Sequence, residues 1–384
     1  MQYRKFGTLD WEVSALGFGC MRLPNTGEEK NIDEPEATRM VRYAIDRGLN
    51  YLDTAYPYHG GNSELFVGRV LKDGYREKVR LATKLPSWHI KASKDFDRYL
   101  NEQLEKLQTD HIDFYLLHAL KEEWWHNLRD LGVLKWAAGA IADGRIGHLG
   151  FSFHDEYAVF QEIVDAYDWT FCQIQYNYVD IENQAGTQGL QYAASKGLAV
   201  VIMEPLLGGQ LVDPPGPIQN LWDTAVKERA PADWALQWLW NQPEVSVVLS
   251  GMSTMEQVEQ NVASAEVSAI NALTAEELAL FAQVREKYTE LCPIPCTKCG
   301  YCMPCPNGVE IPRNFEVYNQ GVMYEKPDHA RRAYTWISED GRASACIQCR
   351  ECEEKCPQSI PISEWMVRVH EVLGEGQPYT CSLS

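Results

Sequence analysis

The stretch EPEATRMVRYAIDRGLNYLDTA (34–55) contains the unit from which most of the chain is built. In its first part Met40, Ala44 and Ile45 recur at the spacing of one helix face. The apolar run LNYLDTA that follows is typical of a buried strand. Because a helix leads directly into a strand here, the stretch predicts an α/β fold.

The same alternation continues in both directions over residues 13–265. The other apolar runs are VSALGFGC (13–20), VRLATKLP (79–86), IDFYLLHA (112–119), IGHLGFSF (146–153), FCQIQYN (171–177), LAVVIMEP (198–205) and EVSVVLSG (244–251). Eight strand–helix units in about 250 residues match the size of a (β/α)8 TIM barrel. The alternative is a doubly wound open sheet. It would need a glycine-rich fingerprint after the first strand, and GFGCMRLP (17–24) matches GxGxxG poorly.

Two capping patterns mark helices near the end of this block. Ser253-x-x-Glu256 predicts the start of the eighth barrel helix, and Thr274-x-x-Glu277 predicts the start of a connecting helix. A further amphipathic segment at 363–373 predicts a C-terminal helix that packs on one of the domains. The expected parts are a barrel (1–272), a connecting helix (273–290), and a small, mainly helical ferredoxin-like domain with a tail (291–384).

The composition is that of a folded protein with an acidic surface. Apolar residues make up 45% and charged residues 23% of the 384 residues. With 35 basic and 54 acidic residues, the net charge of −19 repels nucleic-acid phosphates and favours solubility or a basic protein partner. No apolar run reaches about 18 residues, and the N-terminus lacks the apolar core of a signal peptide. We therefore expect a cytoplasmic protein that binds neither nucleic acid nor membrane.

The 12 cysteines are concentrated near the C-terminus. Cys20 and Cys172 lie in the first 291 residues, nine lie between Cys292 and Cys356, and Cys381 is in the tail. A disulfide framework is uncommon in a cytosolic protein of this size. The clustering therefore indicates metal ligation.

Two cysteine motifs, CTKCGYCMPCP (296–306) and CIQCRECEEKCP (346–357), predict two [4Fe-4S] clusters. The second has the spacing of bacterial ferredoxins, and the first is one residue shorter in its last gap. In that arrangement three thiolates bind one cluster, and the fourth, which precedes a proline, binds the neighbouring cluster. The predicted ligand sets are Cys296, Cys299, Cys302 and Cys356 for one cluster, and Cys346, Cys349, Cys352 and Cys305 for the other.

Two alternatives accompany this prediction. Cys292 is a spare ligand candidate, although we expect it not to bind a cluster. Zinc is the rival metal, but zinc sites usually pair two C-x2-C knuckles across a long separation. The segment between the motifs contains two helical patterns, and it resembles the helical dicluster ferredoxin domains more than the small two-hairpin ferredoxins.

Four titratable residues lie at the ends of successive candidate strands. Asp53, Lys84 and His118 close the second, third and fourth strands, and Tyr58 follows Asp53 by five residues. Functional groups of a (β/α)8 barrel sit at the carboxyl ends of its strands, so all four are expected in one mouth. Each alone fits a structural ion pair or a capped loop, but together they indicate a catalytic site.

These residues carry a family resemblance. DTAYPYHGGNSE (53–64), ATK (82–84) and YLLH (115–118) resemble the motifs of the aldo-keto reductase family, over roughly residues 1–270. With its cysteine domain, the whole chain is similar to the iron–sulfur-containing group of that family. The resemblance implies that Tyr58 is the general acid, and that a tetrad is completed by Asp53, Lys84 and His118.

Elementary chemistry supports these roles. A free tyrosine has a pKa of about 10, which is high for proton exchange near neutrality, and an adjacent ammonium group such as that of Lys84 lowers it. Asp53 would hold and charge-balance the lysine. His118 would orient a substrate carbonyl by hydrogen bonding.

The resemblance also implies a nicotinamide cofactor across the mouth. Ser152 and Gln173 would contact the carboxamide, and Met203 would take the ring-stacking position. The family often has asparagine where this chain has Phe153, and commonly an aromatic residue at the stacking position. The phosphates are expected near the loops after the last two strands, where helix N–H groups favour anions. The candidates there are Leu206, Gly208, Gly209, Ser250, Gly251, Ser253 and Gln257.

The start of the eighth helix lacks a cation. No Lys or Arg occurs between Arg229 and Arg285. Family members that prefer NADPH usually place a cation there to pair with the 2′-phosphate. We therefore predict that NADPH is not favoured over NADH, unless a cation arrives from elsewhere in the fold.

Aromatic residues after the third to fifth strands suit an apolar or ring-bearing carbonyl substrate. The pocket candidates are Trp88, His89, Trp124, Trp125 and His154. Trp124 and Trp125 fit equally well a role in capping a helix or sealing the domain interface.

Three functions remain open. A nicotinamide delivers two electrons as hydride, a cluster takes one at a time, and a flavin such as FMN is the usual converter. In the first reading, an oxidoreductase interconverts a carbonyl and an alcohol with NAD(P)H, and two [4Fe-4S] clusters are coupled to it or serve as a structural or redox-sensing attachment. In the second, a ferredoxin or other electron-transfer protein feeds the clusters, which reduce FMN or the substrate. In the third, the barrel is idle and the chain is an electron-transfer module, which the intact tetrad disfavours.

Overall fold

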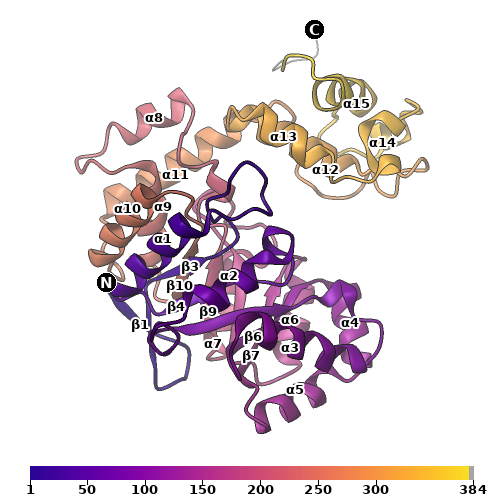
Figure 1. Ribbon diagram of the computed structural model, residues 1–384. Coiled ribbons are helices and arrows are strands. Elements are labelled where there is room, and N and C mark those ends of the chain that lie inside the picture. The colour runs from indigo at the N-terminus through magenta and orange to yellow at the C-terminus, as the bar shows by residue number, and fades with distance from the viewer. Residues whose placement is uncertain (380–384) are drawn as a thin grey trace. The chain divides into compact units, whose positions relative to one another are not determined.

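The computed structural model describes residues 1–379, and its first part is a closed eight-stranded barrel surrounded by helices (Figure 1). All eight strands are parallel and follow the order β10-β3-β4-β5-β6-β7-β8-β9 around the barrel. The strands are β3 (Leu16–Gly19), β4 (Tyr51–Asp53), β5 (Arg80–Leu85), β6 (Ile112–Leu120), β7 (Ile146–Phe153), β8 (Phe171–Gln175), β9 (Ala199–Met203) and β10 (Val245–Ser250). The predicted (β/α)8 fold is confirmed.

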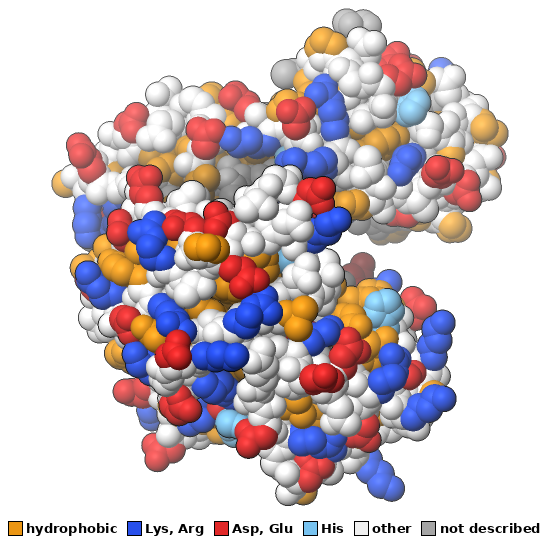
Figure 2. Space-filling model, in the orientation of Figure 1, with side chains coloured by type: hydrophobic (Ala, Val, Ile, Leu, Met, Phe, Trp, Pro, Cys, Tyr) orange, Lys and Arg blue, Asp and Glu red, His pale blue; other side chains and the backbone are white. Residues whose placement is uncertain are grey.

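Helices, most of them amphipathic, cover the outside of the barrel. They are α1 (Glu34–Asp46), α2 (Asn62–Val70), α3 (Lys94–Leu107), α4 (Glu122–Asp130), α5 (Val133–Ala142), α6 (Tyr157–Asp165), α7 (Gly186–Ser195), α9 (Pro231–Trp240) and α10 (Met255–Glu266). In α1, Met40, Ala44 and Ile45 are buried, as their spacing predicts. The exposed positions of such helices carry charge, and Figure 2 shows acidic and basic side chains interspersed over the face in view.

A short hairpin of β1 (Tyr3–Lys5) and β2 (Glu12–Ser14) precedes the barrel. Phe6, in its turn, packs 4.6 Å from the ring of Phe114 and 5.6 Å from that of Phe171, centroid to centroid. These rings belong to one buried cluster with apolar residues of six barrel strands. The barrel interior below the mouth is therefore filled with side chains, so chemistry is confined to the carboxyl ends of the strands.

The two capping predictions have different outcomes. Thr274 and Glu277 form a capping box at the start of α11 (Ala275–Glu290). The pattern Ser253-x-x-Glu256 is wrong by one residue, because Thr254 is the N-cap of α10 and its hydroxyl accepts from Gln257 N. Ser253 instead donates its hydroxyl proton to the backbone oxygen of Arg22.

The described chain forms two compact units. The first contains residues 1–208 and 232–273, and the second contains 209–231 together with the chain from residue 274. The segment 209–231 was expected in the barrel, but its helix α8 (Gly216–Trp222) packs on α11, with the rings of Trp222 and Phe281 5.0 Å apart.

The second unit is mainly helical. Its further helices are α12 (Ile311–Met323), α13 (Pro327–Tyr334), α14 (Glu351–Glu354) and α15 (Ile362–Val369). The predicted C-terminal helix is α15, and its Trp365 packs against Tyr318 of α12 in one apolar core. Among residues 1–379, no helix combines the length and apolar character needed to span a bilayer.

Candidate active site and cysteine site

The barrel mouth brings the four predicted catalytic residues together. Asp53 ends β4, Lys84 lies near the end of β5, and His118 lies near the end of β6. Tyr58 begins a short 3-10 helix over Tyr58–Gly61. Because the strands are parallel neighbours, their carboxyl ends present these side chains to one space.

Lys84 is held in place by three oxygen atoms. Its Nζ donates to Asp53 Oδ1 at 2.7 Å, to Asp53 Oδ2 at 2.8 Å and to the backbone oxygen of Thr54 at 2.8 Å. The same Nζ lies 3.5 Å from Tyr58 Oη. Lys84 is 1% and Asp53 2% exposed, so this ion pair is shielded from water. The ammonium group is therefore fixed beside the phenol.

The pKa of Tyr58 is shifted upward, whereas a downward shift was predicted. Burial raises the pKa of Tyr58, Lys84 opposes this, and Asp53 adds to it, so the net direction is upward. The expected net lowering by Lys84 is therefore wrong, because the phenol is desolvated and an acidic group lies near the lysine. Burial disfavours the charged form of Lys84, but Asp53 and Tyr58 outweigh it and raise its pKa. At neutral pH the pair is a protonated phenol and a charged ammonium.

His118 is neutral in this environment. Burial lowers the pKa of His118 well below its usual value, and the nearby Lys84 and His154 lower it further. Its ring stands nearly perpendicular to that of Tyr58, at 82° with 6.2 Å between centroids. A neutral imidazole in this position can donate a hydrogen bond to a substrate oxygen near the phenol.

A left-handed turn positions Tyr58. His59, Gly60 and Gly61 follow it with φ of 53°, 61° and 93°, and two glycines make such a turn sterically inexpensive. The buried ring of His59 bonds through Nδ1 to the backbone oxygen of Glu29 at 2.5 Å. The loop before α1 thus supports the turn.

The aromatic pocket candidates divide into two groups. Trp88 lies 5.0 Å from His118 and 5.7 Å from Trp124, ring to ring, so these tryptophans adjoin the tetrad. Trp125 is fully buried, and its Nε1 donates to Glu162 at 2.9 Å, so it anchors α4 and does not line the mouth.

The two histidine candidates have different neighbours. His154 is close enough to His118 to lower the pKa of that residue. His89 lines a pocket of about 420 Å³ that also borders Pro57 and Gly60, on either side of Tyr58 in the sequence. The ring of His89 also lies 5.7 Å from that of Trp88, so both histidines lie near the aromatic residues around the tetrad.

The two residues expected to bind the carboxamide lie side by side on adjacent strands. Ser152 of β7 and Gln173 of β8 are paired in register and are 1% and 2% exposed. Gln173 Nε2 donates to Met203 Sδ at 3.5 Å, and its Oε1 has no hydrogen-bond partner among the described residues. A buried, unpaired acceptor suits a ligand N–H. Gln175 Nε2 is likewise unpaired, and strand alternation from Gln173 was the signal that could have found it.

The phosphate candidates lie after β9 and β10. Ser250 is buried and accepts from Asn261, while Ser253 N donates to Gln257 Oε1 at 2.8 Å. Leu206, Gly208 and Gly209 follow β9, and the two glycines have φ of 65° and 93°.

A cation missed by the sequence analysis adjoins these residues. The Arg22 side chain packs over Gly251, where an added Cβ would lie 2.8 Å from Arg22 Cγ. Arg22 follows β3, more than 200 residues before Gly251 along the chain, so no local pattern could have revealed it.

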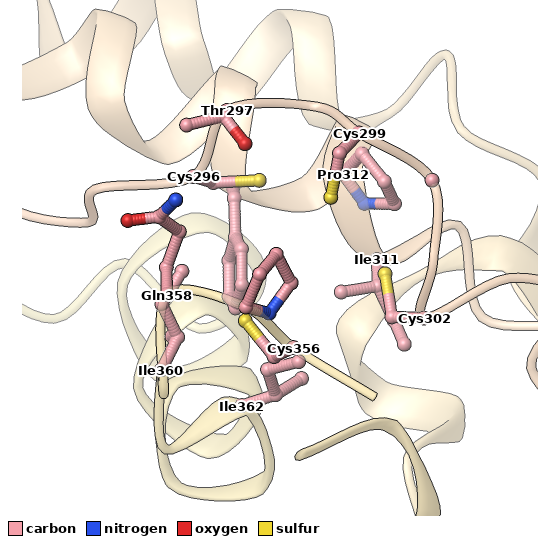
Figure 3. A pocket seen from close by; sticks show the side chains of 13 residues that line it. Cys296, Thr297, Cys299, Cys302, Ile311, Pro312, Cys356, Gln358, Ile360 and Ile362 are labelled. Carbon is pink, nitrogen blue, oxygen red and sulfur yellow. The ribbon is translucent and has the colours of Figure 1, made fainter. Parts of the chain in front are cut away.

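Four of the eight motif cysteines surround one pocket in the second unit. The sulfur atoms of Cys296, Cys299, Cys302 and Cys356 border it, as Figure 3 shows. Its other walls are largely apolar, and include Ile311, Phe315, Ile360 and Ile362. These four thiols are the set predicted for the first cluster. They enclose a space and do not converge on one point, since no three His, Cys, Asp or Glu side chains within residues 1–379 are set to hold a single metal ion.

Cys305 of the first motif lies close to Cys346 of the second. Burial raises the pKa of Cys346, and the proximity of Cys305 and Cys349 raises it further. The motifs also share a backbone shape, because Lys298 and Gly300 have φ of 55° and 75°. The equivalent Gln348 and Arg350 have φ of 59° and 66°. Cys292 lies apart, with its Sγ 2.9 Å from Met323 Sδ.

Two models of known protein families match separate parts of the chain. The model of the aldo/keto reductase family matches residues 15–286, and that of the 4Fe-4S dicluster domain matches residues 295–360. The uncharacterized oxidoreductase YqkF of Bacillus subtilis is 28% identical over 310 residues, covering 72% of this chain and 94% of its own. L-galactose dehydrogenase of Arabidopsis thaliana is 28% identical over 295 residues, covering 69% and 88%.

A solved structure shows the same architecture. The holo form of aldo-keto reductase AKR11C1 from Bacillus halodurans superimposes with a TM-score of 0.63 at 28% identity, over 74% of this chain and 96% of its own. The family match spans more than half of the sequence and includes all four tetrad positions. The chain is thus an oxidoreductase that belongs to the aldo/keto reductase family and carries a C-terminal 4Fe-4S dicluster domain.

Proposed function

We propose that the barrel interconverts a carbonyl and an alcohol with NAD(P)H, with Tyr58 as the acid and base. The observation that carries this proposal is the position of Lys84 Nζ, bonded to both oxygens of Asp53 and 3.5 Å from Tyr58 Oη. A proton donor beside a fixed cation is what a carbonyl needs as its oxygen becomes negative.

The residues divide the work of proton transfer. A nicotinamide, when bound, would supply hydride to the carbonyl carbon. Tyr58 donates its proton to the carbonyl oxygen, and the ammonium group of Lys84 stabilises the phenolate that remains. Asp53 balances the lysine charge and keeps its orientation. Neutral His118 donates a hydrogen bond to the same oxygen, so the substrate is oriented before the proton moves.

The proposed cofactor contacts are the buried, unpaired Oε1 atom of Gln173 with its neighbours, and the loops that follow β9 and β10. Gln173 and Ser152 would hold the carboxamide, and Met203 would lie against the ring. The phosphates would lie near Leu206, Gly208, Gly209, Ser250, Gly251, Ser253 and Gln257.

We keep the proposal that NADPH is not favoured over NADH. The first turn of α10 carries Glu256 and no basic residue. Arg22 is the cation by which the fold could change this preference, because its side chain lies against Gly251.

For the second unit, we propose two [4Fe-4S] clusters with crossed ligands. Cys296, Cys299, Cys302 and Cys356 would hold one, and Cys346, Cys349, Cys352 and Cys305 the other. The clusters would supply one-electron transfer. The largely apolar walls of the first pocket suit an inorganic cluster, because they limit the access of water to its sulfur atoms.

One observation favours a second candidate function. Cys299 and Cys349, one ligand candidate of each cluster, are exposed. Exposure lets an external electron-transfer protein, such as a ferredoxin, exchange electrons with either cluster and so feed FMN or a substrate in the barrel. Detection of bound FMN after anaerobic purification, with no turnover of NADH, would favour this function over the first.

The proposed acid is tested by Tyr58→Phe. We expect reduction of aromatic aldehydes by NADH to fall by about 10²–10⁴ in kcat, the usual contribution of a general acid. Tyr56→Phe is the matched control, because the Tyr56 hydroxyl bonds Glu102 and is not part of the tetrad. Turnover by Tyr58→Phe near the rate of the unaltered protein would refute the assignment.

A further inference from the structure

Strand β6 contains a bulge beside the tetrad. Leu117 pairs with Phe151 and Leu120 pairs with Phe153, so two residues of β6 oppose one residue of β7. The two are His118 and Ala119, and the one opposite them is Ser152. Bulges occur next to active sites because the extra residue redirects a side chain.

The bulge relies on an unusual backbone conformation. Ala119 has φ of 52°, the left-handed region that a residue with a Cβ adopts at a steric cost. Its backbone N–H cannot continue the strand ladder, and instead it donates to Ser152 Oγ at 2.7 Å. Ser152 is 1% exposed, so water does not compete for this bond. The Ser152 hydroxyl oxygen is thus the acceptor that compensates the strained residue.

We propose that Ser152 is a positioning residue, whose hydroxyl oxygen holds the Ala119 bulge and thereby turns His118 toward Tyr58. The role rests on the proposed function of His118 in orienting a carbonyl. It is separate from the carboxamide contact expected of Ser152. A hydroxyl oxygen that accepts from Ala119 still has its own proton to donate to a cofactor.

A double-mutant cycle separates the two roles. Glycine adopts positive φ freely, so Ala119→Gly should keep the bulge without help from Ser152. We expect Ser152→Ala to lower kcat for carbonyl reduction at saturating NADH by about tenfold, and by less than about threefold in the A119G background. The Kd of NADH, measured by fluorescence, reports the carboxamide contact and should change equally in both backgrounds.

Other outcomes overturn the proposal. An equal loss of kcat from Ser152→Ala in both backgrounds would mean that Ser152 acts only through the cofactor. If Ser152→Ala fails to fold, Ser152→Cys takes its place in the same cycle, because a thiol is a weaker acceptor of similar shape.

A crystal structure of the Ser152→Ala variant tests the bulge without turnover. We expect Ala119 to leave the left-handed region and the His118 ring to turn away from Tyr58. An unchanged His118 and Ala119 would overturn the positioning role, whether or not the protein reduces carbonyls. Absence of carbonyl turnover by the unaltered protein, with the bulge lost in the variant, would overturn only the proposed function.

Discussion

The tetrad and the cysteine sites are built in opposite ways. In the barrel, charges are balanced within the protein, since Lys84 is 1% exposed and bonded to both oxygens of Asp53. The cysteine motifs begin in segments without regular structure (295–300 and 346–350), and some of their thiols are exposed. A site balanced by its own residues is stable when empty, whereas thiols arranged around a pocket depend on what fills it. The barrel should therefore persist without ligands, and the second unit should not.

Removing one crossed ligand gives the largest expected effect. Cys356→Ala should reduce iron and sulfide from about eight to about four per chain, because Cys356 borders the pocket of the first motif. The measurement is iron, sulfide and zinc content after anaerobic purification. Cys292→Ala is the control and should keep the full content, since Cys292 contacts Met323. An unchanged iron content in Cys356→Ala would contradict the assignment of Cys356 as a cluster ligand. Zinc in place of iron would contradict the proposal of [4Fe-4S] clusters.

The pH dependence of kcat tests the electrostatics of the tetrad in the barrel. Burial raises the pKa of Tyr58 despite Lys84, so the phenol stays protonated through neutral pH. Carbonyl reduction uses the phenol, so its kcat should be level near neutrality and fall only as pH rises through that raised pKa. Alcohol oxidation uses the phenolate, so its kcat should rise with pH over the same window.

Asp53→Asn should displace both profiles. It removes a charge that raises the pKa of Tyr58, so each curve should move to lower pH. At about pH 7 the reduction rate should fall by up to about 10²-fold, because Lys84 loses the bonds that fix it beside the phenol. Profiles of kcat between about pH 6 and about pH 10.5 check both effects. Curves that stay in place would show that Asp53 does not set the acidity of Tyr58.

The sequence predicts the parts of this comparison that depend on local pattern. Strands buried on both faces appear as continuous apolar runs, so IDFYLLHA predicts β6 almost to its end. The cysteine spacing also predicts the crossed grouping around the first pocket, because it reflects the shape of the cluster.

What the sequence does not reveal depends on tertiary contacts. The bulge at Ala119 leaves no mark in apolar periodicity, and its acceptor Ser152 lies on the next strand. The direction in which the pKa of Tyr58 shifts depends on the burial of its side chain, which a sequence motif does not reveal. The segment 209–231 lies between two barrel strands in the sequence, yet its Trp222 packs on Phe281 in the second unit.

Replacement of Arg22 should change the preference between NADH and NADPH only slightly. The measurement tests whether this residue contacts the coenzyme in the barrel mouth. We expect kcat/KM with NADPH to be no greater than with NADH, and Arg22→Gln to leave the ratio within about twofold. Arg129→Gln is the control, because Arg129 lies on α4 and bonds Asp130 and Glu162. A tenfold preference for NADPH that disappears in Arg22→Gln would show that Arg22 supplies the missing cation.

The smallest expected effect tests whether the two units unfold separately. Thr254 caps α10 in the barrel unit and Thr274 caps α11 in the second, each through its side-chain oxygen. Replacement of either by alanine should cost about 1 kcal/mol of unfolding free energy. Thr254→Ala should lower only the barrel transition in calorimetry, and Thr274→Ala only that of the cluster unit. The second transition should also be lost when iron is removed, while the first persists. If both variants lowered one shared transition equally, the barrel would depend on its neighbour for stability and would not be the self-sufficient half of the chain.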